Sequence, residues 1–284
     1  MRRAYELSQH IGDVGKSLSV LFHLGQSYIM AGRLPEARTL AEPAAKKLEG
    51  LADPILEACS LENLGECYWW SGELHKARPY FKRVLEICEI TSASSLRRRA
   101  GLDLGILPAV FLAMTDLLLG WPDRALEFYG RAVKLAESSL HPYSRFLGLI
   151  MTGWIQQIRG DPSAVHEHLR VSQGFEEYGF YEMSGWASHF DGWCVFWSGD
   201  RTRGIAKMTE ATEKLGAVNS LIMLPWRLIL LGEMKAAVGE TQAAGTCVEQ
   251  ALGTLNLSDE RWFLPEVYRV AAKVALGESP GTPI

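Results

Sequence analysis

Small residues recur along the chain between apolar segments that have helical spacing. The turn glycines of this pattern are Gly32, Gly72, Gly120, Gly160, Gly199 and Gly239, at intervals of 40, 48, 40, 39 and 40 residues. Seven residues before them lie Gly25, Gly65, Ala113, Gly153, Gly192 and Gly232, and five residues after them lie Ala37, Ala77, Ala125, Val165, Gly204 and Ala244. Small residues allow two helices to approach closely, and a glycine accepts the positive φ with which many helices end. The pattern therefore predicts an array of helical hairpins.

Prolines support the same division into helices. Pro35, Pro122 and Pro162 follow a turn glycine by two or three residues, where a second helix would begin and the missing N–H costs nothing. Pro43 and Pro79 instead fall inside predicted second helices, which we expect them to bend because each removes a backbone donor.

The first two hairpins carry the spacing of the tetratricopeptide repeat. The matching residues are Leu24, Gly25, Tyr28, Gly32 and Ala37, and then Leu64, Gly65, Tyr68, Gly72, Ala77 and Phe81. Later repeats keep the glycines but have Gln156, Val195 and Lys235 in place of the tyrosine. We predict an all-α, right-handed α-solenoid of six such hairpins plus terminal helices. In this prediction, residues 1–11 are the leftover second helix of a preceding repeat, residues 12–276 form the superhelix, and residues 277–284 form a flexible tail.

Three longer segments resemble a particular family. "LLLGWPDRALEFYGRAVKLAESSLHPYSRF", "GFYEMSGWASHFDGWCVFWSGD" and "DERWFLPEVYRV" are similar to the C-terminal tetratricopeptide region of bacterial signalling ATPases, which are often fused to class III adenylate or guanylate cyclase, kinase or DNA-binding domains. In "AGLDLGI", Gly101, Asp103 and Gly105 match a Gly-x-Asp-x-Gly element of that family, with Leu104 in place of its usual proline; Pro265 is a second departure. The resemblance implies a regulatory module whose catalytic domains lie upstream, and we expect the chain to be a fragment of such a protein.

The segment "SQHIGDVGKSLSV" contains Gly-Lys-Ser but does not match a nucleotide-binding loop. The full motif needs glycine five residues before Gly15, where the chain has His10, and it must follow a buried strand. We interpret residues 12–16 as a turn between the leftover helix and the first complete hairpin.

Composition excludes several classes of protein. The 284 residues are 48% hydrophobic and 22% charged, and the formal charge of −4 provides no basic field for nucleic acid or for an acidic membrane. The N-terminus has no apolar signal region, and "SLIMLPWRLILLG" is too short to span a bilayer. The five cysteines form no CxxC pair and predict reduced, mostly buried thiols in a cytoplasmic protein: Cys59, Cys67, Cys88, Cys194 and Cys247.

No catalytic constellation emerges from the motifs. His166 and His168 are two residues apart and would point to different sides of a helix, whereas a zinc-binding HExxH places its histidines four apart. The nucleophile motif GxSxG is absent. Arg97, Arg98 and Arg99 lie in the eight-residue excess between the second and third turn glycines, where we expect a solvated basic loop. We predict no enzyme activity, no cofactor and no metal site.

The aromatic residues suggest a binding surface. In the family, positions 13, 10, 6, 3 and 2 residues before the turn glycine face the concave groove. Seven of the nine tryptophans lie at these positions and are joined there by His189 and Phe196; the set is Trp69, Trp70, Trp154, Trp186, His189, Trp193, Phe196, Trp197 and Trp226. Such a lining suits a peptide or an apolar ligand, although each ring could instead pack between repeats. Phe22, Gln26, Glu62 and Glu66 occupy the places of a lysine and asparagine clamp for C-terminal carboxylates, so that type of ligand is disfavoured.

We therefore predict a non-catalytic interaction module that binds a protein or peptide, including upstream domains of its own parent protein. A small-molecule effector domain of a transcription regulator is the alternative, as is an enzyme activity inherited from the parent, which would require catalysis by this chain alone. The oligomeric state stays open.

Overall fold

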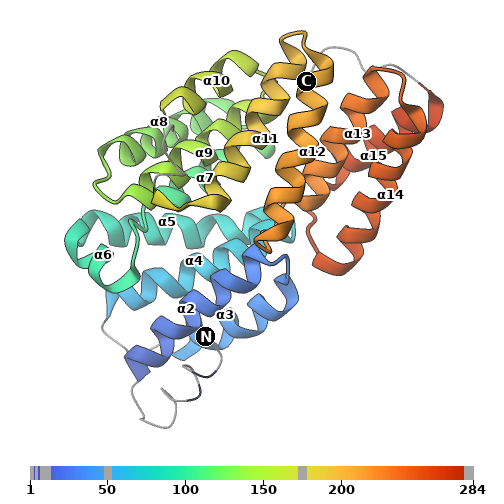
Figure 1. Cartoon of the computed structure of the whole chain (residues 1–284). Helices are drawn as coiled ribbons and strands as arrows, with labels where there is room; N and C mark the ends of the chain where they lie inside the picture. The colour runs from blue at the N-terminus through green and yellow to red at the C-terminus, as the bar shows by residue number, and fades with distance from the viewer. Residues whose placement is uncertain (1–2, 4–5, 7–13, 48–52, 172–177, 278–284) are drawn as a thin grey trace. The chain divides into compact units, whose positions relative to one another are not determined.

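Helices account for the secondary structure in the part of the chain that the computed structural model describes, and no strand occurs there (Figure 1). The structure describes all residues except 1–2, 4–5, 7–13, 48–52, 172–177 and 278–284. Contacts divide the chain into two compact units, Met1–Gly148 and Leu149–Ile284, which are described separately below.

From Val14 onward, the described residues of the first unit form three hairpins and one short helix. The hairpins are α2 (Val14–Met30) with α3 (Leu34–Lys47), α4 (Pro54–Trp70) with α5 (Leu74–Ile90), and α7 (Ile106–Leu118) with α8 (Pro122–Ser138); the short helix is α6 (Ala93–Ala100). Helix α9 (Pro142–Ile158) begins in this unit and is followed by α10 (Pro162–Val171). The second unit continues with α11 (Tyr181–Trp197), α12 (Arg201–Ala217), α13 (Leu224–Ala237), α14 (Thr241–Ser258) and α15 (Leu264–Leu276).

Each predicted turn glycine ends a first helix. All six have positive φ, as expected, and the hydrogen bonds around them repeat one pattern. At the first turn, the Gly32 N–H donates to the Ile29 carbonyl at 2.9 Å and the Arg33 N–H donates to the Tyr28 carbonyl at 2.8 Å. This Schellman arrangement satisfies carbonyls that the helix end would otherwise leave unpaired. The hairpin pattern predicted from the glycine spacing is confirmed.

The predicted close approaches occur at most of the glycines among these small residues. A Cβ on Gly192 of α11 would lie 2.9 Å from the backbone nitrogen of Met208 in α12, and one on Gly65 of α4 would lie 2.9 Å from the ring of Phe81 in α5. Gly153 differs, because its nearest neighbour, the Cβ of His168, would be at an ordinary 3.6 Å. Close contact therefore restricts side-chain size at Gly65 and Gly192, whereas Gly153 has room for a methyl group.

Prolines occupy the predicted places. Pro122 and Pro162 are the first residues of α8 and α10, and Pro35 is the second residue of α3. Pro43 and Pro79 lie inside α3 and α5, which continue through them. Pro265, a departure from the family pattern, is the second residue of α15, a position that tolerates proline.

Two local expectations were wrong. The arginine-rich segment is the helix α6 rather than a loop, with Ser92 as its N-cap and Gly101 at its C-terminal end, and Arg99 forms an ion pair with Asp53 at 2.5 Å. The side chain of Ser92 accepts the N–H of Ser95, which starts the helix.

Helix α2 likewise begins at Val14, so Gly15 and Lys16 are helical and do not form the expected turn. Residues 12 and 13, most of residues 1–11 and all of the predicted tail after Gly277 lie outside the described residues.

No helix in the described part of the chain is both long enough and apolar enough to cross a membrane. The five cysteine thiols are unpaired; four are buried and Cys88 is half-buried.

Candidate functional site

The aromatic set predicted to line a groove is buried within the two units. Eight of its nine members are between 0 and 6% exposed, and Trp197 alone is half-buried. The buried members are Trp69, Trp70, Trp154, Trp186, His189, Trp193, Phe196 and Trp226. Burying an aromatic ring is stabilising, so packing between helices accounts for these positions without a ligand. The accessible lining that we expected is not observed, and a binding role for this set stays a prediction.

In the first unit these rings form one cluster with neighbouring helices. Trp69 and Trp70 of α4 lie 5.0 and 5.7 Å from Phe111 of α7, measured between ring centroids. The indole N–H of Trp69 donates to the hydroxyl of Thr115 at 3.0 Å, so its polar atom is also satisfied. Phe81 of α5 stacks on the same Phe111 at 5.0 Å. The cluster joins the second and third hairpins.

In the second unit the aromatic residues surround buried polar groups. Trp226 of α13 lies 5.3 Å from Trp262, and its indole N–H donates to the amide oxygen of Gln157 at 3.2 Å. His189 is fully buried, and this burial lowers its pKa to about 3, so the imidazole is neutral. It serves here as a packed, uncharged ring rather than as a proton carrier near neutral pH.

Sequence reasoning missed two buried charged residues in this unit. Arg227 of α13 stacks over Trp186 at 4.9 Å and donates to the carbonyls of Ile222 and Ser220 at 2.9 and 3.0 Å. Glu260 accepts the backbone N–H of Met223 at 3.1 Å, and burial raises its pKa to about 8. Both side chains support the irregular segment before α13, where Met223 has φ 61°. Burial could not be inferred from these residue types, which are usually exposed.

The Gly-x-Asp-x-Gly element also has a structural role. The Asp103 carboxylate accepts the hydroxyl of Ser139 at 2.5 Å, and the Asp103 N–H donates to the hydroxyl of Ser144 at 3.0 Å. These bonds connect the segment before α7 to the segment between α8 and α9. Leu104, which replaces the usual proline, is fully buried.

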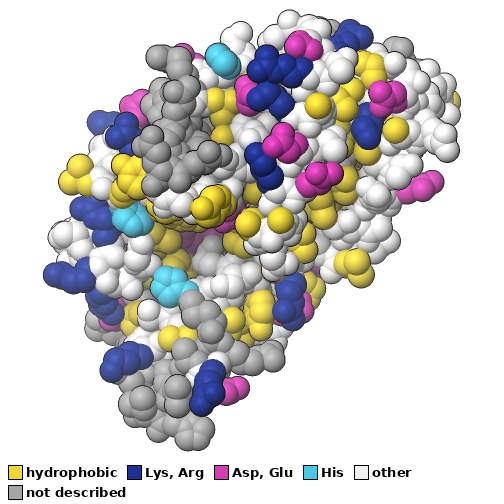
Figure 2. Space-filling model, viewed as in Figure 1, with side chains coloured by type: hydrophobic (Ala, Val, Ile, Leu, Met, Phe, Trp, Pro, Cys, Tyr) yellow, Lys and Arg dark blue, Asp and Glu magenta, His cyan; other side chains and the backbone are white. Residues whose placement is uncertain are grey.

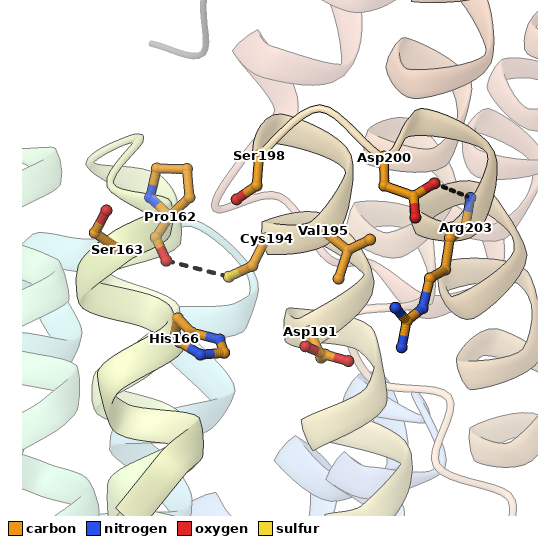
Figure 3. Close-up of a pocket in the computed structure, with 9 residues that line it drawn as sticks. All are labelled: Pro162, Ser163, His166, Asp191, Cys194, Val195, Ser198, Asp200 and Arg203. Carbon is orange, nitrogen blue, oxygen red and sulfur yellow. Dashed lines mark hydrogen bonds between the residues drawn. The ribbon is translucent and has the colours of Figure 1, made fainter.

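An open cleft lies on the second unit between α10, α11 and α12 (Figure 3). It encloses about 450 Å³, and α11 forms its floor between the N-terminal turns of α10 and α12. The lining residues are Pro162, Ser163, His166, Asp191, Cys194, Val195, Ser198, Asp200 and Arg203. A second cleft of about 350 Å³ lies one repeat further on, between α12, α13 and α14. Accessible concave surface is therefore found at these clefts.

Several polar groups of the first cleft already have partners. Asp191 forms an ion pair with Lys207 at 2.6 Å, and Asp200 accepts the backbone N–H of Arg203 at 3.2 Å. The Cys194 thiol donates to the Pro162 carbonyl at 3.3 Å, as Figure 3 shows. The Arg203 side chain has no ion-pair partner among the described residues, which leaves its guanidinium available to a partner's carboxylate.

The thiol that lines the cleft is not activated for covalent chemistry. Burial and the nearby Asp191 raise the pKa of the Cys194 thiol to about 12, so it is protonated and a poor nucleophile near neutral pH. His166 and Glu167 are exposed and His168 is half-buried. No group of three or more side chains that could hold a metal ion occurs within the described ranges.

On the face in Figure 2, Lys and Arg side chains lie beside Asp and Glu side chains in several places.

Comparison with known proteins agrees with this architecture. Two family models described as tetratricopeptide repeat match residues 18–43 and 60–92, which fall in the first two hairpins. Among solved structures, the chain is similar to a Rap protein complexed with Competence and Sporulation Factor, with a TM-score of 0.61 and 14% identity over 93% of this chain and 77% of that chain. No curated protein matches the sequence. The chain is thus an all-α protein of the solenoid type built from tetratricopeptide-like hairpins, and neither similarity indicates a catalytic family.

Proposed function

We propose that the chain is a non-catalytic interaction and regulatory module that binds a protein or peptide partner. The observation that carries this proposal is the helical hairpin, which occurs six times in the described residues and which family models for the tetratricopeptide repeat match twice. Stacked hairpins of this kind form extended surfaces suited to binding other chains. The fold similarity to a Rap protein complexed with Competence and Sporulation Factor also supports the proposal of a partner-binding module.

The resemblance to signalling ATPases extends the proposal to a parent protein. In that setting the module is the sensory or partner-binding part, and its partner is an ATPase, cyclase or other domain of the same pathway or chain. The burial of the aromatic set argues against a permanently open aromatic groove. We therefore assign the cleft between α10, α11 and α12 as the surface that the partner contacts first.

A site-specific crosslinking experiment tests this assignment. A photoreactive amino acid is placed at Ser198, which lines the cleft, and at Ser138, an exposed residue at the end of α8, in cells that encode the protein. We expect one protein to be crosslinked repeatedly from position 198 and not from position 138. Identical products from both positions, or none from position 198, would contradict the assignment.

Reversing the charge of a side chain in the cleft then measures how much the cleft contributes to the affinity for the partner. Arg203→Glu should weaken binding of the identified partner at least about tenfold, because it replaces an unpaired donor by a repelling carboxylate. Lys134→Glu, on the exposed surface of α8, is the matched control and should leave the affinity unchanged. Equal effects of the two variants would remove the cleft from the binding surface.

A further inference from the structure

Two glutamates are buried side by side in the first unit. Glu62 and Glu66 are one helical turn apart on α4 and are 1% and 3% exposed. Residues four apart lie on the same face of a helix, so the two carboxylates share one environment. They stand 10 and 6 residues before Gly72, at positions that the family resemblance assigns to the groove.

Hydrogen bonds satisfy this pair only in part. The amide nitrogen of Gln26 in α2 donates to Glu66 Oε1 at 2.7 Å and to Asn63 Oδ1 at 2.8 Å. The indole N–H of Trp70 lies 3.5 Å from the other Glu66 oxygen. Glu62 Oε2 is buried without any hydrogen-bond partner. The uncharged side-chain amide of Gln26 is thus the main hydrogen-bond donor to this pair of carboxyl groups.

No cation compensates the pair within the described residues. The basic groups of the surrounding helices are engaged elsewhere: Arg38 of α3 with Glu42 and Glu73, Arg78 of α5 with Asp116 of α7, and Arg99 of α6 with Asp53. His23 of α2 is half-buried, and this burial lowers its pKa. The remaining titratable neighbours are the thiols of Cys59, Cys67 and Cys88, whose pKa values burial raises.

Burial therefore has opposite consequences for the aromatic rings and for these carboxylates. A buried ring needs no partner, whereas a buried carboxylate is costly unless a proton or a cation neutralises it. Burial, together with the charge of Glu66, raises the pKa of Glu62 well above its usual value, and burial raises the pKa of Glu66 to about 7. In the free chain the pair accordingly holds a proton at and below neutral pH.

We propose that Glu62 and Glu66 form the binding site for one alkylammonium group of a ligand, whose place the Gln26 amide occupies in the free chain. An ammonium group has three N–H donors. Three acceptors are available once Gln26 moves aside: the unpartnered Glu62 Oε2, Glu66 Oε1 and Asn63 Oδ1. Gln26 is half-buried, and we infer that the ammonium reaches the pair from the surface at this side chain. The ammonium comes from a lysine side chain or a peptide N-terminus, and this inference rests on the proposed partner-binding function.

Proton linkage gives the site a measurable signature. A bound cation favours the ionised carboxylates, so binding releases a proton wherever the free pair is protonated. Because Glu66 has a pKa of about 7, the affinity should rise about tenfold between about pH 6 and about pH 8, and ionisation of Glu62, whose pKa is raised well above its usual value, adds to this rise.

Calorimetric titration with three tripeptides tests the proposal. The first is N-acetylated, C-amidated Gly-Lys-Gly, the second is the same peptide with uncharged norleucine for lysine, and the third is Gly-Gly-Gly amide with a free N-terminus. We expect the first or third peptide to bind at least about tenfold more tightly than the norleucine peptide, with proton release near pH 6. The peptide that binds identifies the lysine side chain or the N-terminus as the source of the ammonium.

Substitutions at the two glutamates test whether amine binding depends on them. The double variant Glu62→Gln, Glu66→Gln should reduce amine affinity at least about tenfold and abolish its pH dependence, since both acceptor charges are lost. Glu57→Gln, on the same helix and paired with Arg83, is the control and should bind as the wild type does. Gln26→Ala should increase the affinity severalfold by removing the competing donor. Because the double variant removes buried charge, we expect it to be at least as stable as the wild type at about pH 8, which separates lost binding from unfolding.

Several results would overturn the inference. These are an affinity of both the lysine peptide and the free-N-terminus peptide no greater than that of the norleucine peptide, no amine binding at about 10 mM, or amine binding that the double variant retains. A partner found by crosslinking that binds the double variant normally would leave the proposed function standing while removing this inference.

Discussion

At the scale of single residues, buried ionisable side chains give the protein pH-dependent stability. Glu260 has a folded-state pKa of about 8, which burial raises above the ordinary glutamate value of 4.5. Between these values the folded state binds more protons than the unfolded state, so stability falls as pH rises through this window. His189 acts in the opposite sense, because its folded-state pKa of about 3 lies below the ordinary histidine value of 6.5 and stability is lost as pH falls.

The contribution of Glu260 can be isolated by an isosteric substitution. Glu260→Gln keeps an acceptor for the Met223 N–H but cannot ionise. We expect the variant to gain stability relative to the wild type as the pH increases from about 5 to about 9, in urea unfolding followed by circular dichroism. A difference between the two proteins that stays constant with pH would contradict this account.

The burial of the aromatic set leads to a second prediction for single residues, which concerns the stability cost of removing a tryptophan. Trp193 is 3% exposed, so Trp193→Ala should leave a cavity and reduce the free energy of unfolding by about 3–5 kcal/mol. Trp197→Ala, four residues further along α11 at a half-buried position, should cost clearly less. Denaturant titration of both variants distinguishes the alternatives. Equal, small losses would restore Trp193 as an open binding residue.

At the scale of elements, the hairpin depends on backbone approach at small residues. Gly204 of α12 leaves no room for a side chain, because a Cβ there would lie 2.6 Å from the backbone nitrogen of Phe196 in α11. The equivalent position of the next hairpin is Ala244, and the following residue, Gly245, has no atom within 4 Å of a built Cβ. Neighbouring positions of a second helix thus differ sharply in what they tolerate.

Because of this difference, we expect the same glycine-to-alanine substitution to lower the stability of the protein at one position and to raise it at the other. Gly204→Ala should destabilise the protein by about 1–3 kcal/mol through forced separation of α11 and α12. Gly245→Ala should stabilise it by about 0.5–1 kcal/mol, because alanine restricts the unfolded chain and favours helix. Thermal unfolding of both variants against the wild type provides the measurement. A neutral Gly204→Ala would show that α11 and α12 can separate at little cost.

At the scale of the whole molecule, we predict no nucleotide chemistry. Gly15 and Lys16 belong to the first turn of α2, and no strand precedes them in the described residues, so the backbone cradle of a phosphate loop is missing. Calorimetry should detect no ATP binding, and assays should detect no cyclic nucleotide. Saturable ATP binding that disappears in Lys16→Ala would refute this prediction.

The periodic features of this protein could be predicted from the sequence, because each has a local cause. Gly32 and its equivalents end helices through positive φ, Pro122 and Pro162 start them, and both effects act within a few residues of the chain. The six hairpins therefore follow from spacing alone. Local signals also explain the missed helix α6, where the N-cap Ser92 was present in the sequence but the three arginines suggested a solvated loop.

The tertiary structure alone decided which side chains are buried. Helical spacing places Trp193 and Glu62 on faces of their helices but does not say whether another helix covers those faces, because that depends on packing between repeats distant in sequence. Packing made the aromatic set part of the interior, buried Arg227 and Glu260, and left Glu62 Oε2 without a partner. Packing likewise opened the cleft between α10, α11 and α12.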